Sequence, residues 1–251
     1  MGKKILLEGK TITDNGIPVT ECYAEGVSNA PLVILNHGTG GNRLQMLEMG
    51  ARLAERGCFC VLVDAVWHGE RGDDKLRMML ETSLYKEYYL DMLLLMAEDM
   101  SRIIDYYSGS EMADVSRTGM SGISQGGYVA FMTMTKDSRI KAAAPIIGSP
   151  DLTDKYGNSL DWDDTDPVVR ERVIAEMPLT HYEKMAGTAL LIQNSTEDTV
   201  VPVTGTRRLN EKLRPLYKDR SGDYRYIEYK GGHWCSDVML ANAVEWLAEK
   251  L

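Results

Sequence analysis

The stretch Gly122-Ile123-Ser124-Gln125-Gly126-Gly127 places a serine between glycines that lie two positions away on either side. This spacing is typical of a nucleophilic serine on a sharp turn between a strand and a helix. Glycine is needed because the turn brings the helix backbone so close to the strand that a Cβ has no room. The flanking sequence agrees, since 117–121 is typical of a short buried strand and 128–134 of an apolar helix. We therefore predict that Ser124 is a catalytic nucleophile.

Two other interpretations of this stretch stay open at this point. Ser124 could be an ordinary serine in a glycine-rich loop, or the loop could hold the phosphates of a dinucleotide. A dinucleotide loop needs the spacing G-x-G-x-x-G, which the glycines of 119–122 do not have. The strand on one side and the helix on the other favour the nucleophile.

A serine hydroxyl is a weak nucleophile, so Ser124 needs a base, and the base needs a carboxylate that orients it. On a strand–turn–helix scaffold these groups follow in the chain order serine, acid, histidine. Of the four histidines, only His181 and His233 follow Ser124. His233 comes directly after the last predicted strand, whereas His181 precedes any suitable acid. We predict that His233 is the base.

The acid is expected just past the strand that precedes the last one. That predicted strand ends near 193–194, and Glu197 and Asp198 follow it. We predict that Asp198 orients His233, with Glu197 as the alternative. A solvated loop charge, the common state of a lone carboxylate, is the other role open to these residues.

The oxyanion of a tetrahedral intermediate needs hydrogen-bond donors that are already in place. One donor is expected to be the backbone N–H of Gln125, the residue after the nucleophile. The other is expected in the loop Asn36-His37-Gly38-Thr39-Gly40-Gly41, and we predict the backbone N–H of Thr39. His37 is then expected to be structural and to bond the loop backbone.

Composition limits the class of protein and its partners. The 251 residues are 44% hydrophobic, enough for the core of one α/β domain spanning 1–251. The net charge of −9 and the lack of a basic stripe argue against nucleic acid and anionic membranes as partners. The oligomeric state stays open.

Location is predicted from the N-terminus and the cysteines. The first residues hold fewer apolar positions than the roughly 7–15 of a secretory signal, and no apolar run is long enough to span a membrane. The four cysteines, Cys22, Cys58, Cys60 and Cys235, lack metal-type spacing. We expect free thiols, with Cys58 and Cys60 on one strand face, and a cytoplasmic protein.

Strands and helices are expected to alternate along most of the chain. This alternation predicts a mainly parallel sheet with helices on both faces, extended by an antiparallel hairpin at the N-terminus. The expected strands are about 3–12, 17–24, 31–36, 58–63, 117–121, 141–147, 188–193 and 224–229, with a turn at 14–16. The expected helices are about 43–56, 86–107, the one that follows Ser124, 203–214 and 236–250.

Residues of about 150–186 interrupt this alternation. They follow a strand on the catalytic side of the sheet, so we predict a small cap-like insertion. Asp166 can cap a helix with Pro167 at its first position, running to about Met177. A calcium-binding loop starting at residue 161 would need Gly and Glu where Asp166 and Arg172 stand, so a helix start is favoured.

Three tryptophans are candidates for the lining of a substrate pocket, namely Trp67, Trp162 and Trp234. Aromatic side chains serve both pockets and cores, so packing in the core is the equal alternative for each.

In their order along the chain, these motifs resemble the α/β-hydrolase family. They are the His-Gly loop, Gly-x-Ser-x-Gly-Gly, Asp before Val-Val-Pro, and Gly-Gly-His. The chain is similar above all to the dienelactone-hydrolase and prolyl-oligopeptidase-like branch, which includes small bacterial serine esterases. The segments 64–71 and 178–182 add to the likeness. Ser124 replaces the cysteine of dienelactone hydrolases, and the chain has no room for the propeller of prolyl oligopeptidases.

The resemblance implies an α/β-hydrolase fold and a serine hydrolase of carboxylic esters, with short-chain or acetyl groups on small molecules. An aminopeptidase or dipeptidase is the alternative within the same branch. A hydrolase-fold protein that only binds ligands is the alternative from another class. No metal or organic cofactor is implied, because a serine triad needs none.

Overall fold

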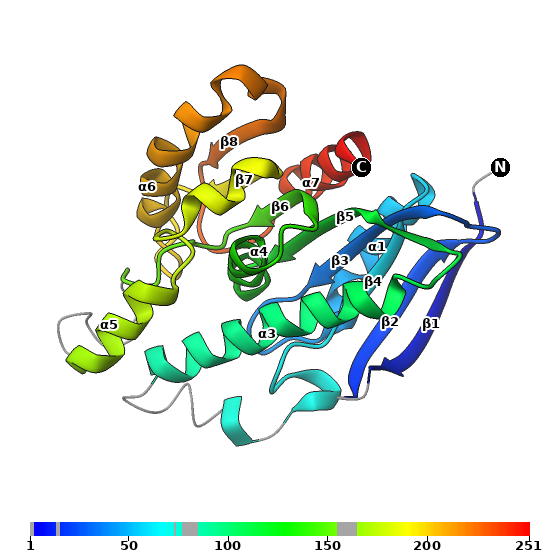
Figure 1. Ribbon diagram of the computed structural model, residues 1–251, viewed down its shortest axis with the longest axis horizontal. Coiled ribbons are helices and arrows are strands. Elements are labelled where there is room, and N and C mark those ends of the chain that lie inside the picture. The colour runs from blue at the N-terminus through cyan, green and yellow to red at the C-terminus, as the bar shows by residue number, and fades with distance from the viewer. Residues whose placement is uncertain (1–2, 14–15, 73, 77–84, 155–164) are drawn as a thin grey trace.

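The computed structural model describes residues 3–13, 16–72, 74–76, 85–154 and 165–251. Within them, eight strands form one sheet in the order β1-β2-β4-β3-β5-β6-β7-β8 (Figure 1). The strands are β1 (Ile5–Ile12), β2 (Ile17–Ala24), β3 (Ala30–Asn36), β4 (Phe59–Val63), β5 (Ala113–Ile123), β6 (Ile140–Ile146), β7 (Ala189–Ser195) and β8 (Tyr224–Tyr229). The pairs β1–β2 and β2–β4 are antiparallel and the others are parallel. The predicted α/β-hydrolase fold class, including the N-terminal hairpin, is confirmed.

Helices cover both faces of the sheet. The α-helices are α1 (Leu47–Glu55), α3 (Tyr85–Tyr107), α4 (Gln125–Lys136), α5 (Pro167–Glu176), α6 (Thr204–Leu213) and α7 (Asp237–Lys250). Short 3-10 helices are η1 (Arg43–Met46), η2 (Gly69–Arg71), η4 (Tyr182–Gly187) and η5 (Arg214–Asp223). Helices α1 and α7 pack on one face, and α3, α4 and α6 on the other.

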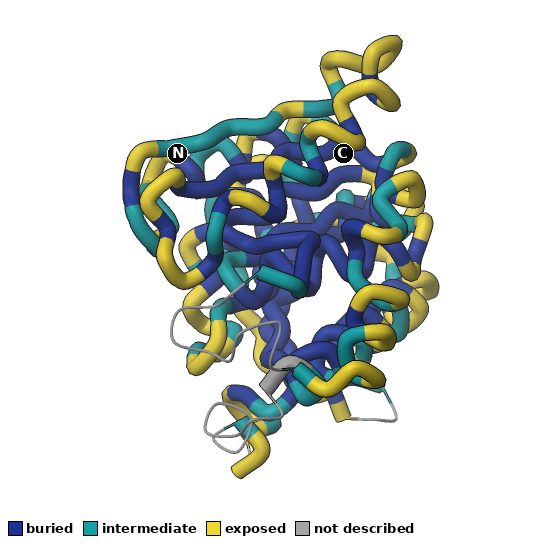
Figure 2. Tube along the Cα trace, turned by 90° about the vertical axis from the view of Figure 1, so that its left-hand side faces the viewer, coloured by how far each residue is buried: buried dark blue, intermediate teal, exposed yellow. Residues whose placement is uncertain are grey.

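The core has two halves because successive residues of a strand point to opposite faces. In β3, Leu32 and Ile34 join the cluster under α3 and α4, whereas Val33 and Leu35 join the cluster under α1 and α7. A strand of this kind is apolar throughout, as its sequence shows. Figure 2 shows the buried residues gathered along the central strands and the exposed ones on the outer helices.

The observed element bounds differ from the predicted ones where local geometry is irregular. Strand β5 begins four residues earlier than expected, and its register with β3 shifts between Pro31 and Leu32. The predicted helix 43–56 opens as η1, which the side chain of Asn42 caps by accepting from Leu44 N–H at 3.0 Å. Helix η5 follows α6 directly and was not among the expected helices.

The cysteines are free in the structure, as predicted. Cys58 and Cys60 pack together with Cys22 in the cluster under α1 and α7, so they share one face. Burial raises the pKa of the Cys22, Cys58 and Cys235 thiols to about 11. Among the described residues, no helix is both long enough and apolar enough to cross a bilayer.

The region predicted as a cap-like insertion contains α5 and η4. Asp166 caps α5 by accepting from Val168 N–H at 2.8 Å, with Pro167 first in the helix, as expected. Ion pairs tie α5 to α3 through Arg172–Asp91 and to α4 through Lys136–Glu176, each at 2.5 Å. Most of the acidic stretch, with Trp162, lies outside the described residues. That the insertion caps the active site stays a prediction.

Candidate active site

Ser124 stands on a strained turn between β5 and α4. Its φ of 56° and ψ of −114° are rare for a residue with a side chain and cost about 1–3 kcal/mol. A Cβ added at Gly122 would lie 2.4 Å from the backbone of Gly126, and one added at Gly126 would lie 2.2 Å from the carbonyl O of Asn36. The glycines of the motif are therefore required by the contact of α4 with β5 and β3.

Replacing Gly126 by alanine is expected to destabilise the fold by about 3 kcal/mol or more, because the clash is with backbone that has no room to move. Gly109→Ala is the matched control. A Cβ there meets nothing within 4 Å, so its effect should stay within about 0.5 kcal/mol. Urea unfolding of both variants measures the difference. Equal stability of the two would contradict the tight packing of α4 on the sheet.

Ser124, His233 and Asp198 form a chain of hydrogen bonds. The distance from Ser124 Oγ to His233 Nε2 is 2.9 Å, and His233 Nδ1 lies 2.7 Å from Asp198 Oδ2. A carboxylate only accepts, so the His233 proton is on Nδ1 and the Nε2 lone pair faces the serine hydroxyl. The fold thus brings together the three residues that the motif order selected. Ser124 and His233 are 109 positions apart in the chain.

The two oxygens of Asp198 have separate partners. Oδ1 accepts from the backbone N–H groups of Val200 and Val201 at 2.9 and 2.8 Å, which turns Oδ2 toward His233. Asp198 is buried. The alternative acid, Glu197, is exposed, and its backbone N–H donates to Gly231 O at 2.9 Å. The geometry therefore selects Asp198.

The loop that carries the predicted donor Thr39 lies beside Ser124 and Gln125. A Cβ added at Gly38 would lie 3.6 Å from the Ser124 Cβ, and Thr39 Oγ1 donates to Gln125 Oε1 at 2.8 Å. Gln125 is the first residue of α4, so its backbone N–H has no acceptor within the helix. The positive end of the helix dipole adds to the attraction for an anion at this point.

His37 fixes the loop that carries Thr39. Its Nδ1–H donates to Gly38 O at 2.7 Å, and its Nε2 accepts from Ala65 N–H at 3.0 Å. In a planar trans peptide, the Gly38 carbonyl and the Thr39 N–H point in opposite directions, so holding one orients the other. His37 bonds the loop backbone as predicted.

The segment 64–71 forms a second loop beside the first. The buried carboxylate of Asp64 accepts from the backbone N–H of Arg43 at 2.7 Å and of Glu70 at 2.9 Å, and pairs with the Arg43 guanidinium. Arg71 pairs with Asp99 at 2.7 Å. Arg43 was not among the predicted site residues, because nothing in its spacing links it to residues some twenty positions away.

Burial lowers the pKa of His37 and His68, so both imidazoles are neutral in the folded protein near pH 7. Unfolded histidine binds a proton near pH 6.5. The contribution of these residues to stability is therefore full above that pH and is lost as the pH falls.

We expect the melting temperature to fall between pH 7 and pH 5, with a smaller fall in His68→Asn. The carboxylates with the largest lowering of pKa, Asp114 and Asp137, have values of about 2 and do not titrate in this window. Melting curves across this pH range test the expectation, and an identical slope in wild type and variant would contradict it.

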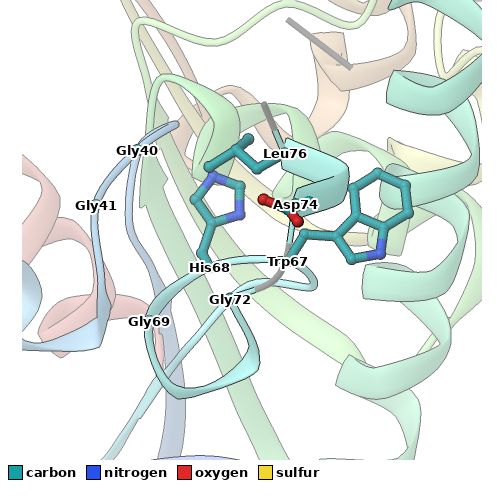
Figure 3. Close-up of a pocket in the computed structure, with 8 residues that line it drawn as sticks. All are labelled: Gly40, Gly41, Trp67, His68, Gly69, Gly72, Asp74 and Leu76. Atoms are coloured by element: carbon teal, nitrogen blue, oxygen red, sulfur yellow. The ribbon is translucent and has the colours of Figure 1, made fainter. Parts of the chain in front are cut away.

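A cavity of about 580 Å³ opens beside the loop 36–41, which carries Thr39 and is called the oxyanion loop below. Its described lining consists of Gly40, Gly41, Trp67, His68, Gly69, Gly72, Asp74 and Leu76 (Figure 3). Trp67 lines this cavity, and its place in a substrate pocket stays a prediction. Trp162 lies outside the described residues. Trp234 is exposed, and its indole packs on Gly231 and Gly232 in the loop that carries His233, so its place in a pocket stays a prediction.

Known proteins resemble this chain in sequence and in fold. YitV of Bacillus subtilis (strain 168), named provisionally as an esterase, is 24% identical and covers 96% of this chain and 98% of its own. Esterase YjfP of Escherichia coli (strain K12) is 24% identical over 86% of this chain and 88% of its own. The crystal structure of TT1662 from Thermus thermophilus is 23% identical, with a TM-score of 0.78 over 97% of this chain and 98% of that one.

A family model also matches most of this chain. The model of the prolyl oligopeptidase family matches residues 53–251, which hold the Ser124 turn, Asp198 and His233. The matched region begins within α1 and covers most of the sheet and both cores. The chain therefore belongs to the prolyl oligopeptidase family.

Proposed function

We propose that this protein is a serine esterase that cleaves carboxylic esters of small molecules through an acyl-enzyme. The hydrogen-bond chain from Ser124 through His233 to Asp198, at 2.9 and 2.7 Å, is the observation that carries the proposal. The two esterase-named relatives, which align along most of this chain, support ester hydrolysis within the family.

In the first half of the reaction, Ser124 Oγ attacks the ester carbonyl carbon while His233 Nε2 takes the hydroxyl proton. Asp198 holds the imidazole in the tautomer that makes this transfer possible and stabilises the imidazolium. The carbonyl oxygen becomes an oxyanion, which accepts from the backbone N–H groups of Thr39 and Gln125. When the C–O bond of the alcohol breaks, His233 returns the proton to the leaving oxygen.

In the second half, a water molecule attacks the acyl group on Ser124. His233 takes a proton from the water and then returns it to Ser124 Oγ as the acyl–serine bond breaks. The products are the carboxylic acid and a regenerated serine. Side chains and backbone amides of this chain perform each step, and a cytoplasmic location with a small-molecule substrate completes the proposal.

A peptidase is the second candidate, favoured by the family to which the chain belongs. The same machinery can cleave an amide, with His233 as the acid that protonates the departing nitrogen. Turnover of esters and amides distinguishes the two functions.

The test compares p-nitrophenyl acetate, butyrate and octanoate with a set of aminoacyl and dipeptidyl p-nitroanilides. A fluorophosphonate probe followed by peptide mass mapping identifies the reactive residue. We expect ester turnover, little anilide turnover and probe on the peptide that contains Ser124. Efficient anilide turnover would make the protein a peptidase, and failure of both turnover and labelling would refute the serine hydrolase.

A further inference from the structure

The cavity beside the oxyanion loop lies on the side of Ser124 opposite to the base. In the sheet, β3 and β4 flank β5 on one side, whereas β7 and β8, which precede Asp198 and His233, lie on the other. The cavity is lined by residues that follow β3 and β4. In the proposed reaction the leaving oxygen must face His233, so the acyl chain is the part of the ester that extends toward this cavity.

Trp67 packs partly against the core and has an unusual backbone conformation. Its φ of 65° is unusual for a bulky side chain. A turn from Ala65 O to His68 N–H at 2.9 Å and a bridge to Gly72 hold it there. The indole is half-buried and lines the cavity (Figure 3). An outlier of this kind points to a functional role, here an apolar face for a ligand.

His68 supplies a hydrogen-bond acceptor that the described residues leave unused. The residue is 2% exposed, and its Nδ1–H donates to Val66 O at 2.8 Å, so Nε2 carries a lone pair. Nε2 is buried and has no partner within the part of the chain that the structure describes. Buried acceptors are nearly always paired, which makes this nitrogen the second sign of a ligand.

The charge around the cavity limits what that ligand can be. Asp74 is the one charged side chain in its described lining. Figure 3 shows its side chain among the residues that line the cavity. The neighbouring guanidinium groups of Arg43 and Arg71 are paired with carboxylates. An anionic group would therefore face the Asp74 carboxylate and would leave the lone pair of His68 unpaired, whereas a hydroxyl can donate to His68.

We propose that this cavity binds an acyl group that carries a hydroxyl, which donates to His68 Nε2 while the carbon chain lies against Trp67. This inference rests on the proposed esterase function. The Asp74 carboxylate would attract an ammonium group only weakly because it is exposed to water, whereas an uncharged hydroxyl pairs the buried His68 Nε2 without burying a full charge beside a neutral imidazole.

The test uses pairs of p-nitrophenyl esters in which a methyl replaces the hydroxyl. One pair is 3-hydroxybutanoate and 3-methylbutanoate, and the other is 6-hydroxyhexanoate and heptanoate, so two chain lengths are covered. The quantity compared is the ratio of kcat/KM for the hydroxylated ester to that for its methyl partner.

In His68→Asn the amide N–H can replace the Nδ1–H bond to Val66, and the acceptor is lost. We expect the ratio to fall about three- to tenfold at one of the two lengths, as loss of one hydrogen bond implies. His68→Gln, whose longer amide can present an oxygen near the Nε2 position, should keep the ratio close to wild type. His181→Asn is the matched control outside the cavity, and its ratio should not change.

Further substrates separate the remaining outcomes. An unchanged ratio in His68→Asn at both lengths would overturn the inference while p-nitrophenyl acetate turnover still supports the esterase. A His68-dependent preference for 2-hydroxyethyl over propyl butyrate would assign the cavity to the alcohol, and a preference for the 6-aminohexanoate ester would assign it to a cation, each overturning the proposal. No turnover of any ester would overturn the inference and the proposed function together.

Discussion

Replacing Ser124 by alanine is expected to lower kcat for p-nitrophenyl butyrate by roughly 10⁶-fold, to the level left by the oxyanion donors and substrate binding. The loss is large because Ser124 Oγ is the atom that attacks, and His233 has no proton to take without it. We expect the backbone conformation to be kept, because the Cβ of alanine has the same steric contacts at φ 56° as the Cβ of serine. The melting temperature should therefore stay close to that of wild type.

Single-turnover kinetics and a melting curve on the same preparation check this result. Ser138→Ala, at an exposed position, serves as the control and should keep wild-type turnover. A folded Ser124→Ala variant with more than about one per cent of wild-type kcat would exclude Ser124 as the nucleophile, given the expected loss.

Replacing Asp198 by asparagine is expected to lower kcat by roughly 10⁴-fold. The backbone N–H groups of Val200 and Val201 hold the oxygen that becomes the amide oxygen. The amide NH₂ then faces His233 Nδ1, where it can only donate. His233 must place its proton on Nε2, so it no longer accepts from Ser124.

The pH–rate profile and kcat of Asp198→Asn and Glu197→Gln, measured side by side, test this reasoning. Glu197 is exposed, so the second variant should behave as wild type. A severe loss in Glu197→Gln together with a mild one in Asp198→Asn would move the role of the acid to residue 197.

The sequence carried most of the fold and of the candidate triad because those signals are local or ordered along the chain. The glycines around Ser124 indicate a close backbone contact, and this signal can be recognised from the motif alone. The position of His233 after the last predicted strand follows from the order of the motifs along the chain. Buried strands such as β3 are apolar at nearly every position, so a continuous apolar run is enough to predict them.

The features that the sequence could not predict depend on contacts between residues that are far apart in the chain or on the conformation of neighbouring segments. The ion pair of Arg43 with Asp64 joins the start of η1 to the end of β4, and the local sequence around either residue does not indicate the other as its partner. The unusual backbone of Trp67 is imposed by the turn and bridge around it, and tryptophan itself gives no hint of a left-handed conformation. The register shift between β3 and β5 likewise involves segments that are far apart in the chain.

The separation of Ser124 and His233 by 109 positions has a consequence for synthesis and damage of the chain. The base lies on the loop after β8, which is the edge strand and the last of the described strands, so a polypeptide that ends before this loop retains the nucleophile turn but has no base. Hydrolytic activity therefore requires the chain through residue 233, with β8 seated at the edge of the sheet. A preparation that is clipped between β8 and His233 should lose turnover, and it should also lose stability because it lacks the core residues that α7 supplies.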